Sequence, residues 1–446
     1  MSASARTVSK GSTEPGPALY GDGSRRIAAS GFVLDTWGPA VHIVPIDSVM
    51  RDVMSIDARA FLSLVSAIAL AAGCSRTDPG SSAATGASSS SASAQAATAG
   101  VPSFGRPGEP VHLSVGYQPY YSEAWSGVVV NGLGLWKKYL PPQSTVDFNV
   151  GLQGSIIVNA MLAGKEQIGY CGDMPAIVGA TKRDVGDLRI VANVGLSHDQ
   201  CNIFLTRTDA PRFSDATAAV GWLGGKTVAV PKGSCADRFA LAVFEKQHVA
   251  PGEYLNQSIE LITSGFRVKK LDAAVVWEPV ASRLVAEGLA RRVATGNDFG
   301  ENDGAFIDMR ADLVQQRPDI VKGWLQAELD AELFLADPRN ARDVARMARE
   351  QTTGFDDRTM WQALFGTYGP EVGGSAARLT LPFGFTPESL ELITRSTAFL
   401  HGAKTIAVSA LAGDAVVTQL TQDVLAERGL KAPVAEVRAA TEMAAK

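Results

Sequence analysis

The chain of 446 residues has few cysteines and histidines and lacks several familiar catalytic motifs. It contains 4 Cys and 5 His, and neither residue type occurs in a Cys-x-x-Cys or His-x-x-x-His metal spacing. No Gly-x-Ser-x-Gly nucleophile turn is present. The run Gly225–Thr227 resembles the end of a phosphate-binding loop, but Val220 stands where that loop needs glycine. The sequence therefore predicts no catalytic residue, no metal and no cofactor.

The charged residues also exclude one class of partner. The formal net charge is −5, and the lysines and arginines are dispersed rather than gathered in a stripe. A nucleic acid is therefore not an expected partner. Apolar residues make up 46% of the chain, which is enough for a large core or for two lobes.

The one long apolar run, Phe61–Gly73, is too short to cross a bilayer, which takes about 20 residues. Arg51 and Arg59 precede the run, and small residues close it before Cys74, which is the layout of an export signal. The ending resembles a bacterial lipobox, although Ala71 stands where leucine is usual. We expect residues 50–74 to be a lipoprotein signal and Cys74 to be lipidated. The alternative is a core helix that ends in Gly-Cys.

The segment Ser75–Gly100 consists almost wholly of Ser, Ala, Thr and Gly. Such a composition cannot offset the entropy of folding, so residues 75–109 are predicted to be a disordered tether, about 30 Å long over its low-complexity part. Residues 1–49 precede the predicted signal and are interpreted as a non-native or disordered extension. The expected location is the periplasmic side of the bacterial cell membrane, with a lipid anchor.

Strands and helices alternate along the chain from Val111 onward. Period-two patterns and short apolar runs predict strands, and apolar residues three or four apart predict helices. The predicted strands are Val111–Gly116, Val146–Val150, Gln167–Cys171, Leu188–Val194, Asn202–Thr206, Lys226–Val230, Ile259–Ile262 and Leu271–Trp277. The predicted helices among them are Trp125–Tyr139, Ser155–Ala163, Ala176–Thr181 and Ala236–His248. This order predicts an α/β fold with mostly parallel sheets.

Beyond Asp312 the pattern becomes helical. Four apolar residues lie four apart and share one helix face: Val321, Leu325, Leu329 and Leu333. Thr386 and Pro387 form a good helix start, with threonine as the cap.

Three short turns follow predicted strands and precede helices: Gly151–Ser155, Gly172–Pro175 and Gly233–Cys235. Glycine lets the backbone pass close to a ligand, and a helix start has free N–H groups and partial positive charge. In open α/β sheets, ligands bind at the carboxyl ends of strands. Each turn alone could be an ordinary cap, but the three together favour a ligand site.

Several motifs resemble those of the nitrate, taurine and aliphatic-sulfonate binding proteins of ABC importers. The matching stretches are Val115–Pro119, Gly154–Ser155, Ala160–Lys165, Ile168–Asp173 with Pro175, Leu223–Val230 with Gly233–Ser234, and Lys270–Pro279. The resemblance covers about Val111 to Asp337. One departure is the stretch between Ile262 and Lys270, which is shorter than the family pattern, so a helix there is expected to be clipped.

The resemblance implies a two-lobed periplasmic-binding-protein fold with a helical C-terminal region, in which ligand is held between the lobes. We expect residues 110–205 to begin the first lobe, 206–280 to form the second, and 281–446 to return to the first lobe and add C-terminal helices. The implied partners are a small organic anion, an ABC permease and its ATPase, and the chain is expected to be a monomer and not an enzyme.

The candidate ligand-binding residues lie at strand ends and helix starts: Gln118, Tyr120, Ser155, Asp173, His198, Ser234, Cys235, Trp277 and Glu278. Glutamine and serine can donate hydrogen bonds to a ligand oxygen, and aromatic rings can form a wall against an organic body. Structural roles remain open beside these. Trp125 could form the wall or pack within its helix, Asp173 could cap its helix, and Glu278 could hold a hinge.

The thiols Cys171, Cys201 and Cys235 each lie near a strand end or helix start. Two of them could form a disulfide in an exported protein, they could be plain buried thiols, or they could line the ligand pocket. With His198 they could also bind a soft metal. The alternative functions are therefore a metal-binding or sensory lipoprotein that uses this cluster, or a thiamine-pyrimidine-synthesis-like enzyme of the same fold.

Overall fold

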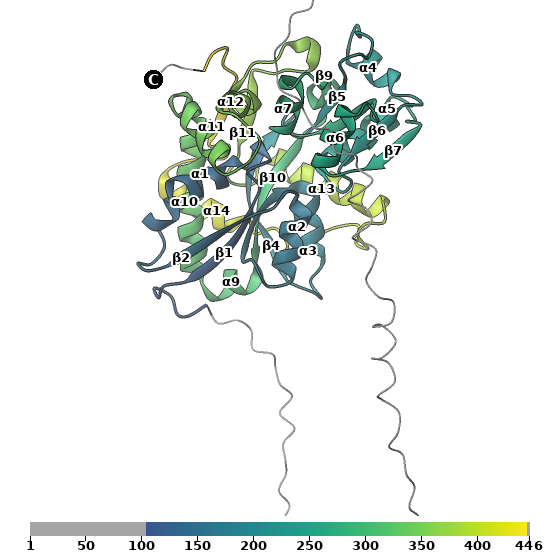
Figure 1. Cartoon of the computed structure of the whole chain (residues 1–446). Helices are drawn as coiled ribbons and strands as arrows, with labels where there is room; N and C mark the ends of the chain where they lie inside the picture. Colours follow the sequence, from purple (N-terminus) through teal and green to yellow (C-terminus); the bar gives the residue numbers. More distant parts are fainter. Residues whose placement is uncertain (1–103, 444–446) are drawn as a thin grey trace, which may run out of the picture. The chain divides into compact units, whose positions relative to one another are not determined.

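The computed structural model describes residues 104–443. The predicted extension, the signal, Cys74 and all but the end of the tether lie outside the described residues. Within them, the strands form two sheets, and Figure 1 shows the two sheets as separate parts of the folded chain.

The first sheet has seven strands in the order β12-β11-β4-β10-β3-β1-β2. The strands are β1 His112–Tyr117, β2 Thr145–Val150, β3 Ile168–Gly172, β4 Leu188–Ser197, β10 Asp303–Arg310, β11 Ala377–Leu381 and β12 Ala435–Arg438. Strand β1 runs parallel to β2 and β3, but β10 is inserted between β3 and β4 and is antiparallel to both. The prediction of mostly parallel sheets is therefore wrong. The sheet is mixed because a strand from much later in the chain enters it.

The second sheet has five strands in the order β7-β6-β8-β5-β9. They are β5 Ile203–Arg207, β6 Thr227–Val230, β7 Glu253–Asn256, β8 Ala273–Val276 and β9 Ala290–Thr295. This sheet is also mixed, since β6 is parallel to β7 and β8 while β5 is antiparallel to β8 and β9. Its last strand extends beyond residue 280, where the sequence placed the end of the second lobe.

Two crossing segments join the sheets: residues 198–202 between β4 and β5, and residues 296–302 between β9 and β10. They are hydrogen-bonded to each other. His198 Nδ1 lies 2.8 Å from the Glu301 carbonyl oxygen, and the Gly296 N–H donates to the Asn202 carbonyl at 3.1 Å. The chain thus returns from the second lobe beside the point where it entered.

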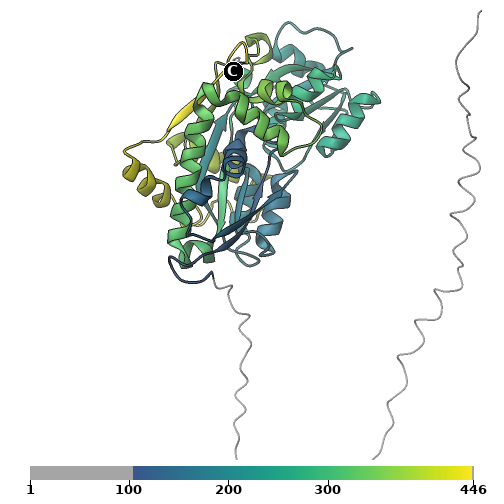
Figure 2. The same cartoon turned by 60° about the vertical axis from the view of Figure 1, so that its left-hand side comes forward.

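Helices flank both sheets, as the two views in Figures 1 and 2 show. Their bounds are α1 Trp125–Leu133, α2 Gly154–Leu162, α3 Asp173–Thr181, α4 Ala216–Trp222, α5 Cys235–Lys246, α6 Ile259–Arg267, α7 Val280–Ala286, α8 Gly296–Phe299, α9 Ala311–Gln316, α10 Pro318–Ala336, α11 Ala341–Glu350, α12 Asp357–Phe365, α13 Pro387–Gly402 and α14 Gln419–Arg428. None of these helices is both long and apolar enough to cross a membrane.

The first lobe has apolar clusters on both faces of its sheet because side chains alternate along its strands. On β10, Ala305, Ile307 and Met309 join one cluster, while Phe306 joins the other with Ile157 of α2. This alternation follows from the two-residue period of a strand. The second lobe is held by an aromatic contact between Phe204 of β5 and Phe239 of α5, whose ring centroids lie 5.0 Å apart.

Two element predictions need correction. The helix predicted over Trp125–Tyr139 ends at Leu133, because Gly134 adopts a left-handed conformation (φ 61°), and a 3-10 turn follows. The predicted strand Ile259–Ile262 is the start of helix α6 instead. Ser258 caps it, and Ile259, Ile262 and Phe266 share its buried face. The stretch between Ile262 and Lys270, where a clipped helix was expected, thus lies largely within helix α6.

The region beyond Asp312 is mainly helical but also contains β11 and β12, which were not predicted. The predicted apolar stripe is confirmed on α10, where Val321, Leu325 and Leu329 are fully buried. The helix start at Thr386 is also confirmed, since its side chain accepts from the Ser389 N–H in a capping box.

Candidate functional site

A pocket lies between the two lobes, with about 400 Å³ of empty space including the part open to solvent. The lining residues from the first lobe are Gln118, Tyr121, Gln153, Gly154, Ser155, Gly172 and Pro175. Those from the second lobe are Pro231, Lys232, Gly233, Ser234, Cys235 and Trp277. All three predicted glycine turns therefore contribute to one pocket.

The first-lobe wall is the beginning of α2. Gly154 starts this helix, and a side chain there would collide with its neighbours, because an added Cβ would lie 2.5 Å from Pro175 Cγ and 2.9 Å from Cys171 Cβ. Ser155 is exposed to the pocket, and its hydroxyl has no hydrogen-bond partner within residues 104–443. The first N–H groups of a helix have no partners inside the helix. The first-lobe wall of the pocket thus presents uncharged hydrogen-bond donors, namely the Ser155 hydroxyl and backbone N–H groups.

The second-lobe wall is the beginning of α5. Ser234 caps the helix by accepting from the Asp237 N–H at 3.3 Å, and its own hydroxyl donates to the Pro231 carbonyl at 2.6 Å. The Gly233 N–H donates to Asp237 Oδ2 at 2.9 Å, and Gly233 has φ +78°, which favours glycine. The backbone N–H groups of Cys235 and Ala236 are left without helical partners.

Aromatic rings complete the pocket. Tyr121 and Trp277 lie edge to face with centroids 6.4 Å apart, and the Trp277 indole donates to the Tyr120 carbonyl at 2.9 Å. Gln118 is buried and donates to the Tyr170 carbonyl at 3.3 Å. Trp125 is fully buried and packs within the first lobe, which supports the packing role rather than a wall of the site.

Buried acidic groups lie behind Tyr121. Its hydroxyl oxygen is 2.6 Å from Glu123 Oε2 and 3.2 Å from Asp303 Oδ2. Burial raises the pKa of Asp303 to about 6, and burial followed by the nearby charge of Asp303 raises the pKa of Glu123 well above its usual range. Burial therefore favours a proton on Glu123, which shares a hydrogen bond with Asp303.

Four of the predicted ligand residues do not line the pocket. Tyr120 is part-buried with its hydroxyl 3.2 Å from Thr353 Oγ1, and His198 belongs to the first crossing segment. Asp173 is fully buried and is tied to Arg238 Nε at 3.2 Å and Ser396 Oγ at 2.7 Å.

The fourth, Glu278, lies in a buried ionic network at the crossing between the lobes. Its Oε1 accepts from Arg292 Nη1 at 3.1 Å and from the Tyr368 hydroxyl at 3.0 Å. Arg292 and Arg378 both pair with Asp199 and both stack on the Tyr368 ring. The guanidinium groups of Arg292 and Arg378 thus face the carboxylates of Asp199 and Glu278. Glu278 therefore links the end of a second-lobe strand to the crossing segment and to the returning chain.

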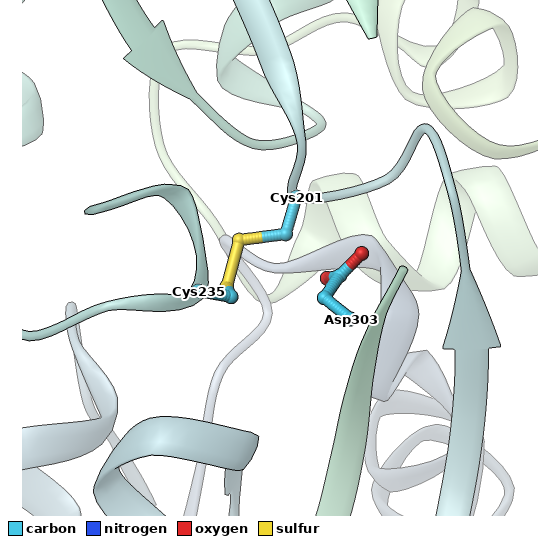
Figure 3. Close-up of side chains that lie close together, drawn as sticks. All are labelled: Cys201, Cys235 and Asp303. Atoms are coloured by element: carbon cyan, nitrogen blue, oxygen red, sulfur yellow. A yellow bond between two sulfur atoms is a disulfide. The ribbon is translucent and has the colours of Figure 1, made fainter. Parts of the chain in front are cut away.

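The cysteines divide into a disulfide and a free thiol. Cys201, in the first crossing segment, is bonded to Cys235, the first residue of α5, with Cα atoms 6.2 Å apart (Figure 3). Cys171 is free and fully buried, and burial raises the pKa of its thiol well above the usual range. Its sulfur donates to Asp308 Oδ2 at 3.8 Å. The three thiols and His198 therefore do not form one cluster.

Sequence reasoning thus placed Gln118, Ser155, Ser234, Cys235 and Trp277 on the pocket. It missed Tyr121, Gln153, Pro231 and Lys232 as individual residues. Tyr121 follows the chosen Tyr120, Gln153 lies inside a chosen turn, and Pro231 and Lys232 directly precede another chosen turn. The turns themselves were therefore a better guide than the chemistry of single side chains.

Comparisons with known proteins place this geometry in context. Residues 257–349 match the model of the NMT1-like family. No curated protein matches the sequence. Among solved structures, the alkanesulfonate-binding protein SsuA from Xanthomonas axonopodis pv. citri bound to MOPS has a TM-score of 0.56 at 20% identity, covering 69% of this chain and 99% of that one.

Two further solved structures share the fold. The periplasmic nitrate-binding protein NrtA from Synechocystis PCC 6803 has a TM-score of 0.54 at 17% identity, covering 72% of this chain and 90% of that one. The desulfurization enzyme DszB has a TM-score of 0.52 at 17% identity, covering 71% of this chain and 99% of that one. The predicted two-lobed periplasmic-binding-protein fold is thus confirmed, and this fold hosts both binding proteins and a desulfurization enzyme.

Proposed function

We propose that this protein is the substrate-binding component of an ABC importer and captures a small organic anion between its lobes. The observation that carries the proposal is the pair of helix starts, α2 from one lobe and α5 from the other, on opposite walls of one pocket. Each start offers free N–H groups and the positive end of a helix dipole. An anion between them would be bound from both sides.

The pocket chemistry supports an anion with an organic body. Among the described residues that line it, Lys232 is the one with a charged side chain, and it is exposed. Neutral donors can hold a sulfonate, sulfate ester or nitrate-like group without a buried countercharge. Tyr121, Trp277 and the two prolines give an apolar wall. The raised pKa of Glu123 limits negative charge behind that wall.

The cysteine chemistry supports binding rather than a thiol-dependent reaction. The one cysteine that lines the pocket, of those described, is Cys235, and its sulfur is in a disulfide. Cys171 is buried with a raised pKa, so its thiolate is disfavoured. Neither sulfur offers a ready nucleophile.

Delivery and anchoring follow as parts of the same proposal. The lobes would close on the anion, and the closed form would dock on a membrane permease driven by a separate ATPase. A lipid on Cys74 would hold the protein at the periplasmic side of the membrane, with residues 75–103 as tether, because the carbonyls of Phe104 and Glu109 are bonded to Arg317 of the first lobe. Mass spectrometry of membrane-fraction protein tests this part, and an unmodified Cys74 would contradict it.

The ligand class is tested by thermal shift and calorimetric titration of the purified protein. Alkanesulfonates, taurine, sulfate esters and nitrate are the test ligands, and matched primary amines without an anionic group are the controls. A ligand at a hundredfold excess over its Kd should stabilise the protein by about 2.7 kcal/mol. Stabilisation by the amines alone, or by none of the anions, would overturn the proposed ligand class.

A further inference from the structure

The disulfide lies beside an acidic side chain that has no role in the proposed anion site. The Asp303 carboxylate, at the start of β10, faces the bond between Cys201 and Cys235 (Figure 3). One carboxylate oxygen and the two sulfur atoms all lie within 4.8 Å of one another. All three residues are buried.

Asp303 is paired with a second buried acid. Burial and the nearby charge of Asp303 raise the pKa of Glu123, so Glu123 keeps its proton and shares it with Asp303 in a hydrogen bond. The pair keeps one negative charge, and a buried charge is costly unless a cation lies beside it. The guanidinium of Arg238 compensates this charge only in part, because Arg238 is bonded to Asp173 and to the Asn302 carbonyl.

We propose that reduction of the disulfide creates a site for a borderline-soft divalent cation such as Zn²⁺, with the Cys201 and Cys235 thiolates and the Asp303 carboxylate as ligands. Thiolate and carboxylate are both established zinc ligands, at about 2.3 Å and about 2.0–2.2 Å. The chain supplies three ligands, as in open zinc sites. The fourth position is left to water or to a molecule in the cleft, since Cys235 lines the pocket.

The chemistry balances with a dithiol or phosphine as the reductant. Two electrons and two protons break the S–S bond and give two thiols, while the dithiol becomes a disulfide or the phosphine, with water, becomes a phosphine oxide. Binding of the cation then releases both thiol protons. In the tetrahedral site the sulfur atoms would lie about 3.8 Å apart, as set by the zinc–sulfur distance. In the oxidised protein, the S–S bond occupies the place of the cation.

This site goes beyond the proposed function, because anion capture uses helix N–H groups and not the sulfur atoms. The experiment uses the whole chain, reduced anaerobically with a phosphine and checked by circular dichroism. Zn²⁺ is titrated against a chromophoric chelator, and Co²⁺ is bound in parallel to reveal thiolate-to-metal charge transfer. We expect about one Zn²⁺ per reduced chain and no binding of comparable affinity to the oxidised chain.

Substitutions assign the ligands. Asp303→Asn should weaken Zn²⁺ binding to the reduced protein at least tenfold, while Asp308→Asn and Cys171→Ser should leave it unchanged. Asp308 is the matched control, because it is a buried carboxyl on the same strand beside the other thiol. If Asp303→Asn does not fold, the cobalt spectrum of the reduced wild type decides.

The proposal is overturned by absence of Zn²⁺ binding to the reduced protein, by unchanged affinity in Asp303→Asn, or by loss of binding in Cys171→Ser. A cobalt complex without thiolate charge transfer also overturns it. Anion binding by the oxidised protein is measured separately. Failure of the metal site therefore leaves the proposed function untouched, and failure of anion binding leaves the metal site untouched.

Discussion

Ser155 and Ser234 begin the two facing helices, yet the structure gives them different tasks. The Ser155 hydroxyl has no hydrogen-bond partner among the described residues and faces the pocket. The Ser234 hydroxyl donates its one proton to the Pro231 carbonyl and accepts from the Asp237 N–H. An anion needs donors, so only Ser155 has a hydroxyl proton free to give. The same substitution should therefore have separable effects at the two sites.

Ser155→Ala should weaken anion binding and leave the unfolding free energy within about 0.5 kcal/mol of wild type. Loss of a hydrogen bond to a charged group costs about 1.5–3 kcal/mol, which raises Kd by about 10-fold to 150-fold. Ser234→Ala should lower the unfolding free energy by about 1 kcal/mol through loss of the cap. Its Kd should change less than that of Ser155→Ala, because the N–H donors of α5 remain.

Calorimetric titration with an alkanesulfonate and chemical denaturation of the same preparations measure the two quantities. Ser126→Ala provides a matched control, since Ser126 is a fully buried serine in α1 and does not line the pocket. The reasoning is refuted if Ser155→Ala leaves Kd unchanged while its stability falls. It is equally refuted if Ser234→Ala loses more affinity than Ser155→Ala at unchanged stability.

Three further perturbations test other parts of the structure. Replacing Cys201 and Cys235 together by serine should lower the unfolding free energy by about 4 kcal/mol, because the disulfide closes a loop with a sequence separation of 34; an unchanged denaturation midpoint would contradict this. Glu278→Gln removes one of the two carboxylate partners of the buried Arg292 and leaves Asp199 as the other, so it should cost about 1–3 kcal/mol in the same assay, whereas an unchanged denaturation midpoint would argue against the network. Burial raises the pKa of Asp308 to about 8. Its stabilising effect is therefore complete below pH of about 4 and is lost as pH rises toward 8, by roughly 2–3 kcal/mol between pH 5 and 7. Asp308→Asn should remove this part of the pH dependence, and parallel curves for variant and wild type would show the pKa argument to be wrong.

The sequence predicted the position of the pocket well where backbone turns form its lining. Gly154 and Gly233 follow strands β2 and β6, Gly172 ends β3, and ligands of open α/β sheets bind at the carboxyl ends of strands. The residues that form a turn depend on the local sequence, so a turn can be predicted without knowledge of the fold. The same reading chose Asp173 and Glu278, which also follow strands. Their side chains do not line the pocket but pair with Arg238 and Arg292, and no local pattern encodes such partners.

Short apolar runs were the weaker signal. The residues Ile259–Ile262 fit a buried strand and the first turn of a helix equally well, since periodicity cannot separate the two over four residues. The cap at Ser258 and the apolar Phe266 later in the segment indicate a helix. The antiparallel strand β10 escaped prediction for another reason. Its place between β3 and β4 depends on the path of the chain through the second lobe and not on its own pattern.

The pairing of Cys201 with Cys235 bears on how the site is prepared for ligand. Three thiols left the pairing open, and the fold resolves it by bringing the first crossing segment to the start of α5. That first turn is then fixed three times over, by the disulfide, by the Ser234 cap and by the bond from the Gly233 N–H to Asp237. Donors that are ordered before binding lose little entropy on binding. In the proposed binding role, the second-lobe wall would therefore meet an anion without local rearrangement of α5.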